Sequence, residues 1–139
     1  MSAMRGAAAY GRGASAYAKV GVESAVMSAS PHQLIVMLFD GAQASIRTAR
    51  IHLEDGNVAE KGKAISKALD IVNNGLLAAL DAERGGEIAE RLASLYDYVA
   101  RLLLSANRSN DVESLNQAEA LLNDIASAWR EIGDKAPGQ

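Results

Sequence analysis

The chain has 139 residues, of which 49 % are hydrophobic and 22 % charged, and this is the size and composition of one globular domain. It contains no cysteine, which excludes disulfides and thiolate chemistry and fits a reducing cytoplasm. Residues 1–30 carry a net charge of +2 (three basic side chains against one acidic) and residues 31–139 carry −5 (11 against 16). This acidic body argues against binding to nucleic acid, which requires a basic patch.

The N-terminal stretch MSAMRGAAAYGRGASA, residues 1–16, is rich in Ala, Gly and Ser. It lacks the apolar segment of a secretory signal, and its glycine content is unlike that of an organelle transit peptide. We therefore expect residues 1–16 to form a flexible arm, residues 17–133 to form the folded domain, and residues 134–139 to fray.

The stretch SPHQLIVMLFDG begins the first predicted helix, residues 31–55. Ser30 is a favourable N-cap, Pro31 suits the first helical position, and Gln33 completes a capping box. Six apolar residues follow at 34–39, too few to span a bilayer, which takes about 20. Because successive helical side chains turn by about 100°, these six cover the whole circumference of the helix. Such a helix must be covered on every side.

Three further helices are predicted at 58–83, 87–108 and 111–132, each with apolar residues at steps of three and four. Long helices joined by short turns pack antiparallel to their neighbours. The sequence therefore predicts an all-α fold, an antiparallel up-down four-helix bundle, with a short N-terminal helical or extended flap. The predicted turns are EDGN at 54–57, RGG at 84–86 and RSND at 108–111.

Several residues near these turns carry specific expectations. Asn57 and Asn110 are predicted to cap the second and fourth helices, and Gly56 is predicted to adopt the left-handed conformation after the first. Gly62 and Gly75 lie inside the second helix, where each costs up to about 1 kcal/mol relative to Ala. They mark either close helix contacts or tolerated weak points.

The two histidines do not support a metal centre. A di-iron bundle needs Glu-x-x-His motifs, and an alanine stands three residues before both His32 and His52. We interpret His32 as a solvent-exposed residue of the first helical turn. A histidine phosphotransfer domain is an alternative, since the stretch HLEDG, His52 to Gly56, places a glycine four residues after the histidine. However, Glu54 and Asp55 place negative charge where a phosphoryl group requires positive charge.

Asp40, Gly41 and Trp129 are the other residues that bear on a catalytic or ligand-binding role. Asp40 and Gly41 could indicate a catalytic carboxylate, but no general base or glycine loop accompanies them. Asp40 is expected to face solvent or a polar neighbour, and Gly41 to let another backbone approach closely. Trp129 falls on the core stripe of the last helix, with direct ligand contact left open. The sequence predicts no enzyme, no cofactor and no metal.

The apolar run at 34–39 is more than the bundle alone can cover, because each helix of a bundle leaves about half its circumference free. Two segments could cover it: the preceding stretch Tyr17–Met27 folded back as a flap, or an amphipathic helix of a partner. Burying a Leu-sized side chain yields about 1.5–3 kcal/mol. Ordering a disordered partner costs about 2–5 kcal/mol or more. A long wrapped segment is therefore favoured over a single helical turn.

Five long segments follow one another from about Tyr17 to Ile132 in a specific order and spacing: YAKVGVESAVMSASPHQLIVMLFDGA, KALDIVNNGL, GGEIAERLASLYDYVARLL, ANRSNDVESL and IASAWRE. In these segments the chain resembles the FliS family of flagellar export chaperones. It departs from the family in Phe39, where many relatives have Tyr, and in the length of its N-terminal arm.

The resemblance implies a chaperone of the bacterial cytosol that binds the disordered C-terminal segment of flagellin. The client wraps around the bundle and so cannot polymerise early. The family also presents its client to the export gate protein FlhA, and the anti-sigma factor FlgM is a secondary partner to consider. The segment around Tyr17 is implicated in occupying the bundle surface. The alternative is a regulatory bundle that self-associates, for instance as a homodimer, through the same apolar surface.

The residues predicted to contact the partner combine excess apolar side chains of the first helix with polar residues that fix register. For Tyr96 the other interpretation is a core residue, for Arg101 a surface charge, and for Asp111 a turn residue. The full set is Leu34, Met37, Leu38, Asp40, Tyr96, Tyr98, Arg101, Asn107 and Asp111, with Tyr17 and Val20 on the flap.

Overall fold

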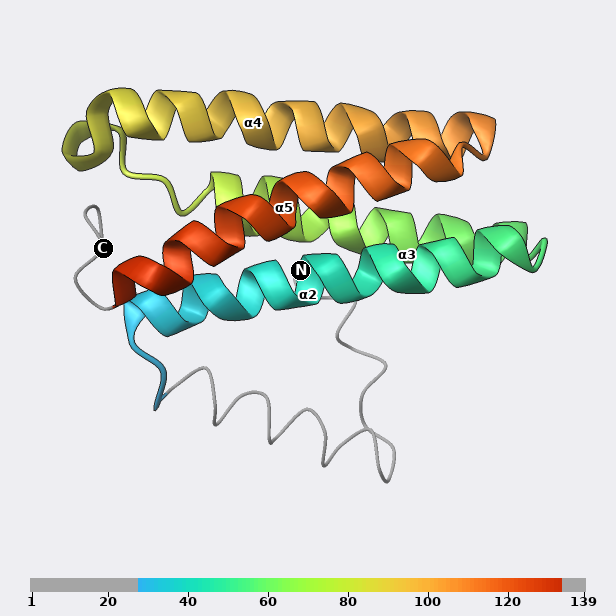
Figure 1. Ribbon diagram of the computed structural model, residues 1–139, viewed down its shortest axis with the longest axis horizontal. Helices are drawn as coiled ribbons and strands as arrows, with labels where there is room; N and C mark the ends of the chain where they lie inside the picture. The colour runs from blue at the N-terminus through green and yellow to red at the C-terminus, as the bar shows by residue number, and fades with distance from the viewer. Residues whose placement is uncertain (1–27, 134–139) are drawn as a thin grey trace. The chain divides into compact units, whose positions relative to one another are not determined.

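The computed structural model describes residues 28–133, and the stretch from Pro31 to Ile132 forms four helices packed side by side (Figure 1). The helices are α2 (Pro31–Glu54), α3 (Val58–Asp70) continued by the π-helix η1 (Ile71–Leu77), α4 (Ala82–Ser109) and α5 (Val112–Ile132). α2 packs against α3 and α5, while α4 packs against α5 and η1, so the four close into a ring. The predicted all-α antiparallel bundle is confirmed. The predicted arm, flap and C-terminal tail lie outside the described residues.

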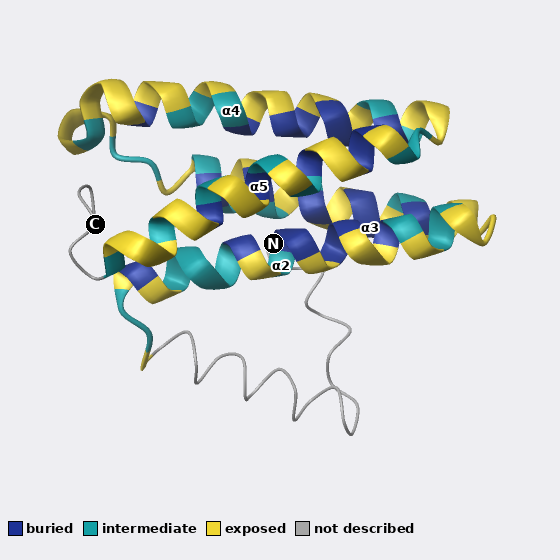
Figure 2. Ribbon diagram, viewed as in Figure 1, coloured by how far each residue is buried: buried dark blue, intermediate teal, exposed yellow. Residues whose placement is uncertain are grey.

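The core lies between the helices, on the faces that the three-and-four spacing predicts (Figure 2). Alanines such as Ala49, Ala68 and Ala106 have no exposed surface, and their small side chains let neighbouring helices approach closely. Tyr96 belongs fully to this core, with 3 % of its surface exposed. The largest completely buried aliphatic residues are Ile46, Ile65, Leu103, Leu115 and Leu122.

The second turn lies before the predicted stop at residues 84–86, so the bounds of two helices differ from the prediction. The second helix ends at Leu77 and α4 begins at Ala82. Asp81 sets this start, because its carboxylate accepts two backbone N–H groups of the first turn, each at 3.1 Å. Gly86 then departs from helical geometry inside α4, with φ 51° and ψ −125°. The glycines therefore interrupt the helix after its first turn instead of preceding it.

The turns at the other end agree only in part with the predicted caps. Gly56 has the expected positive φ of 76°. Asn57 makes no capping hydrogen bond through its side chain, and its amide lies 3.4 Å from Nδ1 of His52. Asn110 ends α4 in the left-handed conformation, and the next residue, Asp111, caps α5 by accepting a backbone N–H at 3.0 Å. The predicted Asn110 cap is thus wrong by one residue.

Of the two glycines inside the second helix, Gly75 lies at a close helix contact and Gly62 does not. A Cβ on Gly75 would lie 3.0 Å from Cδ2 of Leu38, so this glycine marks a close contact between η1 and α2. A Cβ on Gly62 would meet its nearest neighbour at 3.8 Å, an ordinary contact. Gly41 faces Cδ1 of Ile71 at 3.3 Å, a side chain where we expected a backbone.

Candidate functional site

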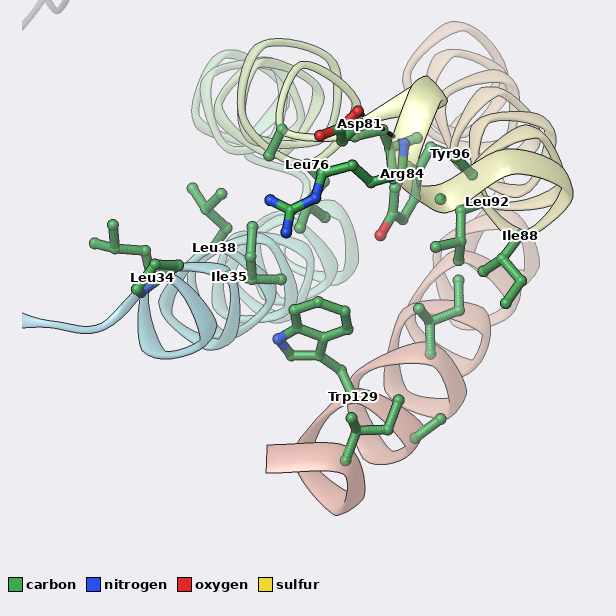
Figure 3. Close-up of a pocket in the computed structure, with 18 residues that line it drawn as sticks. Leu34, Ile35, Leu38, Leu76, Asp81, Arg84, Ile88, Leu92, Tyr96 and Trp129 are labelled. Atoms are coloured by element: carbon green, nitrogen blue, oxygen red, sulfur yellow. Dashed lines mark hydrogen bonds between the residues drawn. The ribbon is translucent and has the colours of Figure 1, made fainter. Parts of the chain in front are cut away.

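An apolar cavity of about 600 Å³ opens at one end of the bundle, where α2 and α4 begin and η1 and α5 end (Figure 3). Eighteen residues line it, and two of them, Asp81 and Arg84, carry charge. The rest of the wall is mainly Leu, Ile and Ala from all four helices, with Tyr96 and Trp129. A space of this volume and polarity is typical of sites that bind apolar ligands or side chains of a partner.

The apolar run at 34–39 is only partly covered by the bundle. Phe39 is buried and its ring lies 6.3 Å from that of Tyr96, so it belongs to the core. Leu34, Ile35 and Leu38 are half-buried and line the cavity. Part of the apolar surface predicted to be in excess on the first helix therefore lies in the cavity wall, while Val36 and Met37 are half-buried outside it.

His32 and Trp129 join the start of α2 to the end of α5, although 97 residues separate them in the sequence. Their rings are stacked, with centroids 5.2 Å apart and planes 10° apart. Nε2 of His32 donates to the carbonyl oxygen of Trp129 at 2.7 Å, and Nε1 of Trp129 donates to the carbonyl oxygen of His32 at 3.3 Å. The prediction of an exposed His32 is wrong, because the indole covers it and leaves 7 % exposed.

Tyr96 and Trp129 both serve the core and the cavity. Tyr96 lines the inner part of the cavity while remaining almost fully buried. Burial raises the pKa of its hydroxyl from the ordinary 10.0 to about 12. Trp129 is half-buried: it packs against the core, as the helical pattern predicts, and also lines the cavity.

Two charged residues line the cavity. The Asp81 carboxylate is engaged with the backbone N–H groups that begin α4. The Arg84 side chain extends from α4 toward Ile35 and Leu38 of α2 (Figure 3). An occupant with an apolar face and a polar edge would match this distribution.

The predicted polar partner-binding residues are not gathered at the cavity. Asp40 is exposed and forms an ion pair with Arg130 of α5, in agreement with the expected polar neighbour. Arg101 is an exposed charge that pairs with Asp97 at 2.8 Å, and Tyr98 is 48 % exposed on α4. Met37 is half-buried on α2 and does not line the cavity.

Asn107 and Asp111 lie at the opposite end of the bundle, around the buried Lys61. Nζ of Lys61 donates to the carbonyl oxygen of Asn107 at 2.9 Å and also to the side-chain oxygen of Asn110. An ammonium group at the C-terminus of α4 complements the partial negative charge of the helix end. Asp111 caps α5 and also accepts from Oγ of Ser114 at 2.9 Å. The structure gives both residues a role in closing this turn.

Sequence reasoning missed several residues of the cavity. Ile88, Leu92 and Ile132 fall on the three-and-four apolar spacing of their helices, which predicts core positions. Ile88 and Ile132 are instead 62 % and 43 % exposed, and all three line the cavity. Arg84 belongs to a predicted turn but also lines the cavity. Their position could have indicated the cavity, because these residues lie near one end of the bundle, where neighbouring helices can diverge.

The described residues offer little for other chemistry. Between residues 28 and 133, no group of three or more His, Asp or Glu side chains could hold a metal ion. In the same range, no helix is both long and apolar enough to cross a membrane. His52, considered for phosphotransfer, lies near the end of α2 away from the cavity, within contact distance of Asn57.

Comparison with known proteins identifies the class to which the chain belongs. The family model described as flagellar protein FliS matches residues 13–136. The chain is 58 % identical over 127 residues to the flagellar secretion chaperone FliS of Salmonella typhimurium, covering 91 % of this chain and 94 % of that protein. It is 48 % identical over 120 residues to the FliS chaperone of Escherichia coli, covering 86 % and 88 %.

More distant relatives extend the match. The identity to the flagellar secretion chaperone FliS of Bacillus subtilis is 28 % over 109 residues, which covers 78 % of this chain and 80 % of that protein. These proteins define a class, the flagellar secretion chaperones. The chain belongs to the FliS family, as its resemblance in sequence predicted, and this is a family of chaperones and not of enzymes.

Proposed function

We propose that this protein is a cytosolic export chaperone that binds the disordered C-terminal segment of flagellin. In this role it prevents premature polymerisation of the client and helps deliver it to the flagellar export apparatus. The observation that carries the proposal is the open apolar cavity, because a bundle that only needed to fold would have no use for it. Membership in a family of flagellar secretion chaperones supports the choice of client.

The cavity fits one apolar face of a client helix. Its wall is formed mainly by Leu, Ile, Ala and aromatic side chains, with Asp81 and Arg84 as the charged residues. An amphipathic helix laid in such a groove buries its apolar residues and leaves its polar face in water. Each Leu-sized side chain contributes about 1.5–3 kcal/mol. Several anchors are needed to exceed the roughly 2–5 kcal/mol that ordering the client costs.

The residues proposed for client contact start from the cavity and continue over the neighbouring surface. Leu34, Leu38 and Tyr96 of the predicted set line the cavity. Met37 and Asp40 extend the surface along α2, while Tyr98 and Arg101 provide exposed contacts on α4 for a client that wraps around the bundle. Asn107 and Asp111 are proposed as client contacts at the turn between α4 and α5, in addition to their roles in closing that turn.

Two further parts of the proposal concern the flap and other partners. Tyr17 and Val20 are proposed to compete with the client for the apolar surface, although they lie outside the described residues. With its client bound, the chaperone is proposed to contact the export gate protein FlhA. The anti-sigma factor FlgM is the proposed secondary partner, and a pull-down of each with and without client tests these two interactions.

The central experiment mixes the purified protein with the last several dozen residues of flagellin from the same genome. We expect a 1:1 complex by calorimetry and a gain of helix by circular dichroism, since an amphipathic client folds on binding. No heat and no added helix would contradict the proposal. A concentration-dependent dimer that flagellin leaves unchanged in sedimentation would instead support the self-associating bundle.

A further inference from the structure

The clamp between His32 and Trp129 lies at the wall of the cavity. Trp129 contacts His32 through its stacked ring and, at the same time, lines the cavity where the client is proposed to bind. The indole N–H of Trp129 donates to the backbone carbonyl of His32, and the backbone carbonyl of Trp129 accepts from the imidazole. The second bond holds the imidazole in place, and the imidazole holds the indole by stacking.

Without these contacts the indole of Trp129 would be expected to rotate into the cavity. It is half-buried beside an open apolar space of about 600 Å³, and moving into that space would remove more of its surface from water. The clamp opposes this movement because the indole N–H would lose its acceptor and enter apolar surroundings. The stacked imidazole adds an attraction that a rotated indole would lose.

We propose that His32 is a positioning residue for client binding, which keeps the cavity open by holding the indole of Trp129 at its wall. His32 itself does not line the cavity, so it acts through Trp129. This inference rests on the proposed function, because it takes the cavity as the client site. It assigns a role in recognition to a histidine that the helical pattern places on the solvent side.

The test compares the wild-type protein with His32→Ala, which removes the stacked imidazole and its donor to the Trp129 carbonyl but keeps the backbone carbonyl that accepts from the indole. The variant's indole is expected to fill part of the cavity, so that only a fraction of molecules is competent to bind. We expect about a tenfold loss of affinity for the flagellin segment, in proportion to that fraction. Trp129 is the single tryptophan of the chain, so acrylamide quenching of the free protein reports on this indole alone. We expect less quenching in His32→Ala than in the wild type.

Three variants separate positioning from general stability. His52→Ala removes the other histidine, near the far end of α2, and is expected to bind as the wild type does. Ile46→Val weakens the buried core without touching the clamp, and is also expected to retain its affinity. His32→Phe keeps a ring for stacking but has no donor for the carbonyl, and its affinity is expected to lie between wild type and His32→Ala.

The outcomes are decisive in both directions. Binding by His32→Ala within twofold of wild type, or a loss no greater than that of Ile46→Val, would overturn the inference. Unchanged quenching in free His32→Ala would overturn it as well. If wild type and His52→Ala both failed to bind the flagellin segment, the proposed function would fail, while the quenching comparison would still decide whether His32 holds the indole.

Discussion

The two ends of the bundle are built from the same four helices, yet one is filled and the other is hollow. At the filled end, Ile46, Ile65 and Leu115 are completely buried and small alanines lie between them. At the hollow end, large residues such as Leu34 and Leu92 remain half-exposed around the cavity.

The course of α5 explains the difference between the ends. It crosses the bundle diagonally, close to α4 where the two helices are joined by a short turn and close to the start of α2 at its own end (Figure 1). The clamp between His32 and Trp129 fixes that second contact. As α5 leaves α4 the two helices diverge, and residues of both, together with α2 and η1, line the cavity at that end (Figure 1). The two ends show that one continuous apolar stripe can form a packed core in one half and line an open cavity in the other.

The largest expected effect comes from placing a charge in the hollow end. In Ile35→Glu a carboxylate would stand in the cavity wall, and burying it under an apolar client leaves it unpaired. We expect the affinity for the flagellin segment to fall at least about a hundredfold, with helical content retained. Calorimetry and circular dichroism measure the two quantities.

The matched control for this substitution lies on the same helix. Ile51 is 57 % exposed near the end of α2, away from the cavity, so Ile51→Glu introduces the same side chain without entering the client site. Its affinity should equal that of the wild type. Equal losses from both substitutions would contradict the division of the bundle into two ends.

The next effect concerns the filled end and stability alone. In Lys61→Met the packing of the stem is kept, but the carbonyl of Asn107 and the amide oxygen of Asn110 lose their donor. We expect the free energy of unfolding to fall by roughly 2–3 kcal/mol, measured by urea denaturation. Client affinity should not change under native conditions. Lys63→Met, which affects an exposed lysine paired with Glu60, should leave stability nearly unchanged.

A pH effect follows from Tyr96, where core and cavity meet. Its pKa is raised to about 12, so the folded protein holds this proton more tightly than the unfolded chain, whose value is near 10.0. The contribution to stability is therefore complete below pH 10 and is lost as the pH rises through about 12. We expect a loss of roughly 2 kcal/mol by the end of that interval. Tyr96→Phe should remove both this dependence and the latest tyrosinate signal in an absorbance titration.

The smallest expected effect comes from the contact between η1 and α2. In Gly75→Ala the new methyl group would press on Leu38, which can yield only toward the cavity that it lines. We expect the gain in helix propensity and the crowding to cancel to within about 1 kcal/mol, while client affinity falls about threefold. In Gly62→Ala the methyl group meets no close neighbour, so stability should rise and affinity stay constant. Affinity unaffected by Gly75→Ala would show that Leu38 does not shape the client site.

The sequence predicts the four helices and most of the core because periodicity reports which face of a helix is apolar. The apolar run at residues 34–39 also predicts that the bundle covers the first helix incompletely, and Leu34, Ile35 and Leu38 of that run line the cavity. It did not predict the cavity, since periodicity says nothing about how far apart two helices lie at their ends. His32 was misplaced for a related reason: its covering partner, Trp129, is 97 residues away.

The turn between η1 and α4 was missed for a different reason. The glycine pair at 85 and 86 is a stronger stop signal than the single Asp81, yet the aspartate begins the helix and Gly86 only interrupts it. Local signals compete at such a place, and the sequence alone does not say which one prevails.

The interruption at Gly86 also separates the first turn of α4 from the part that packs in the core. A residue inserted or deleted between Ala82 and Gly85 would rotate Arg84 around the rim, while Leu92 and all that follows would keep their register. A change of length there would therefore reshape the entrance of the cavity while the packed part of the bundle stayed as it is.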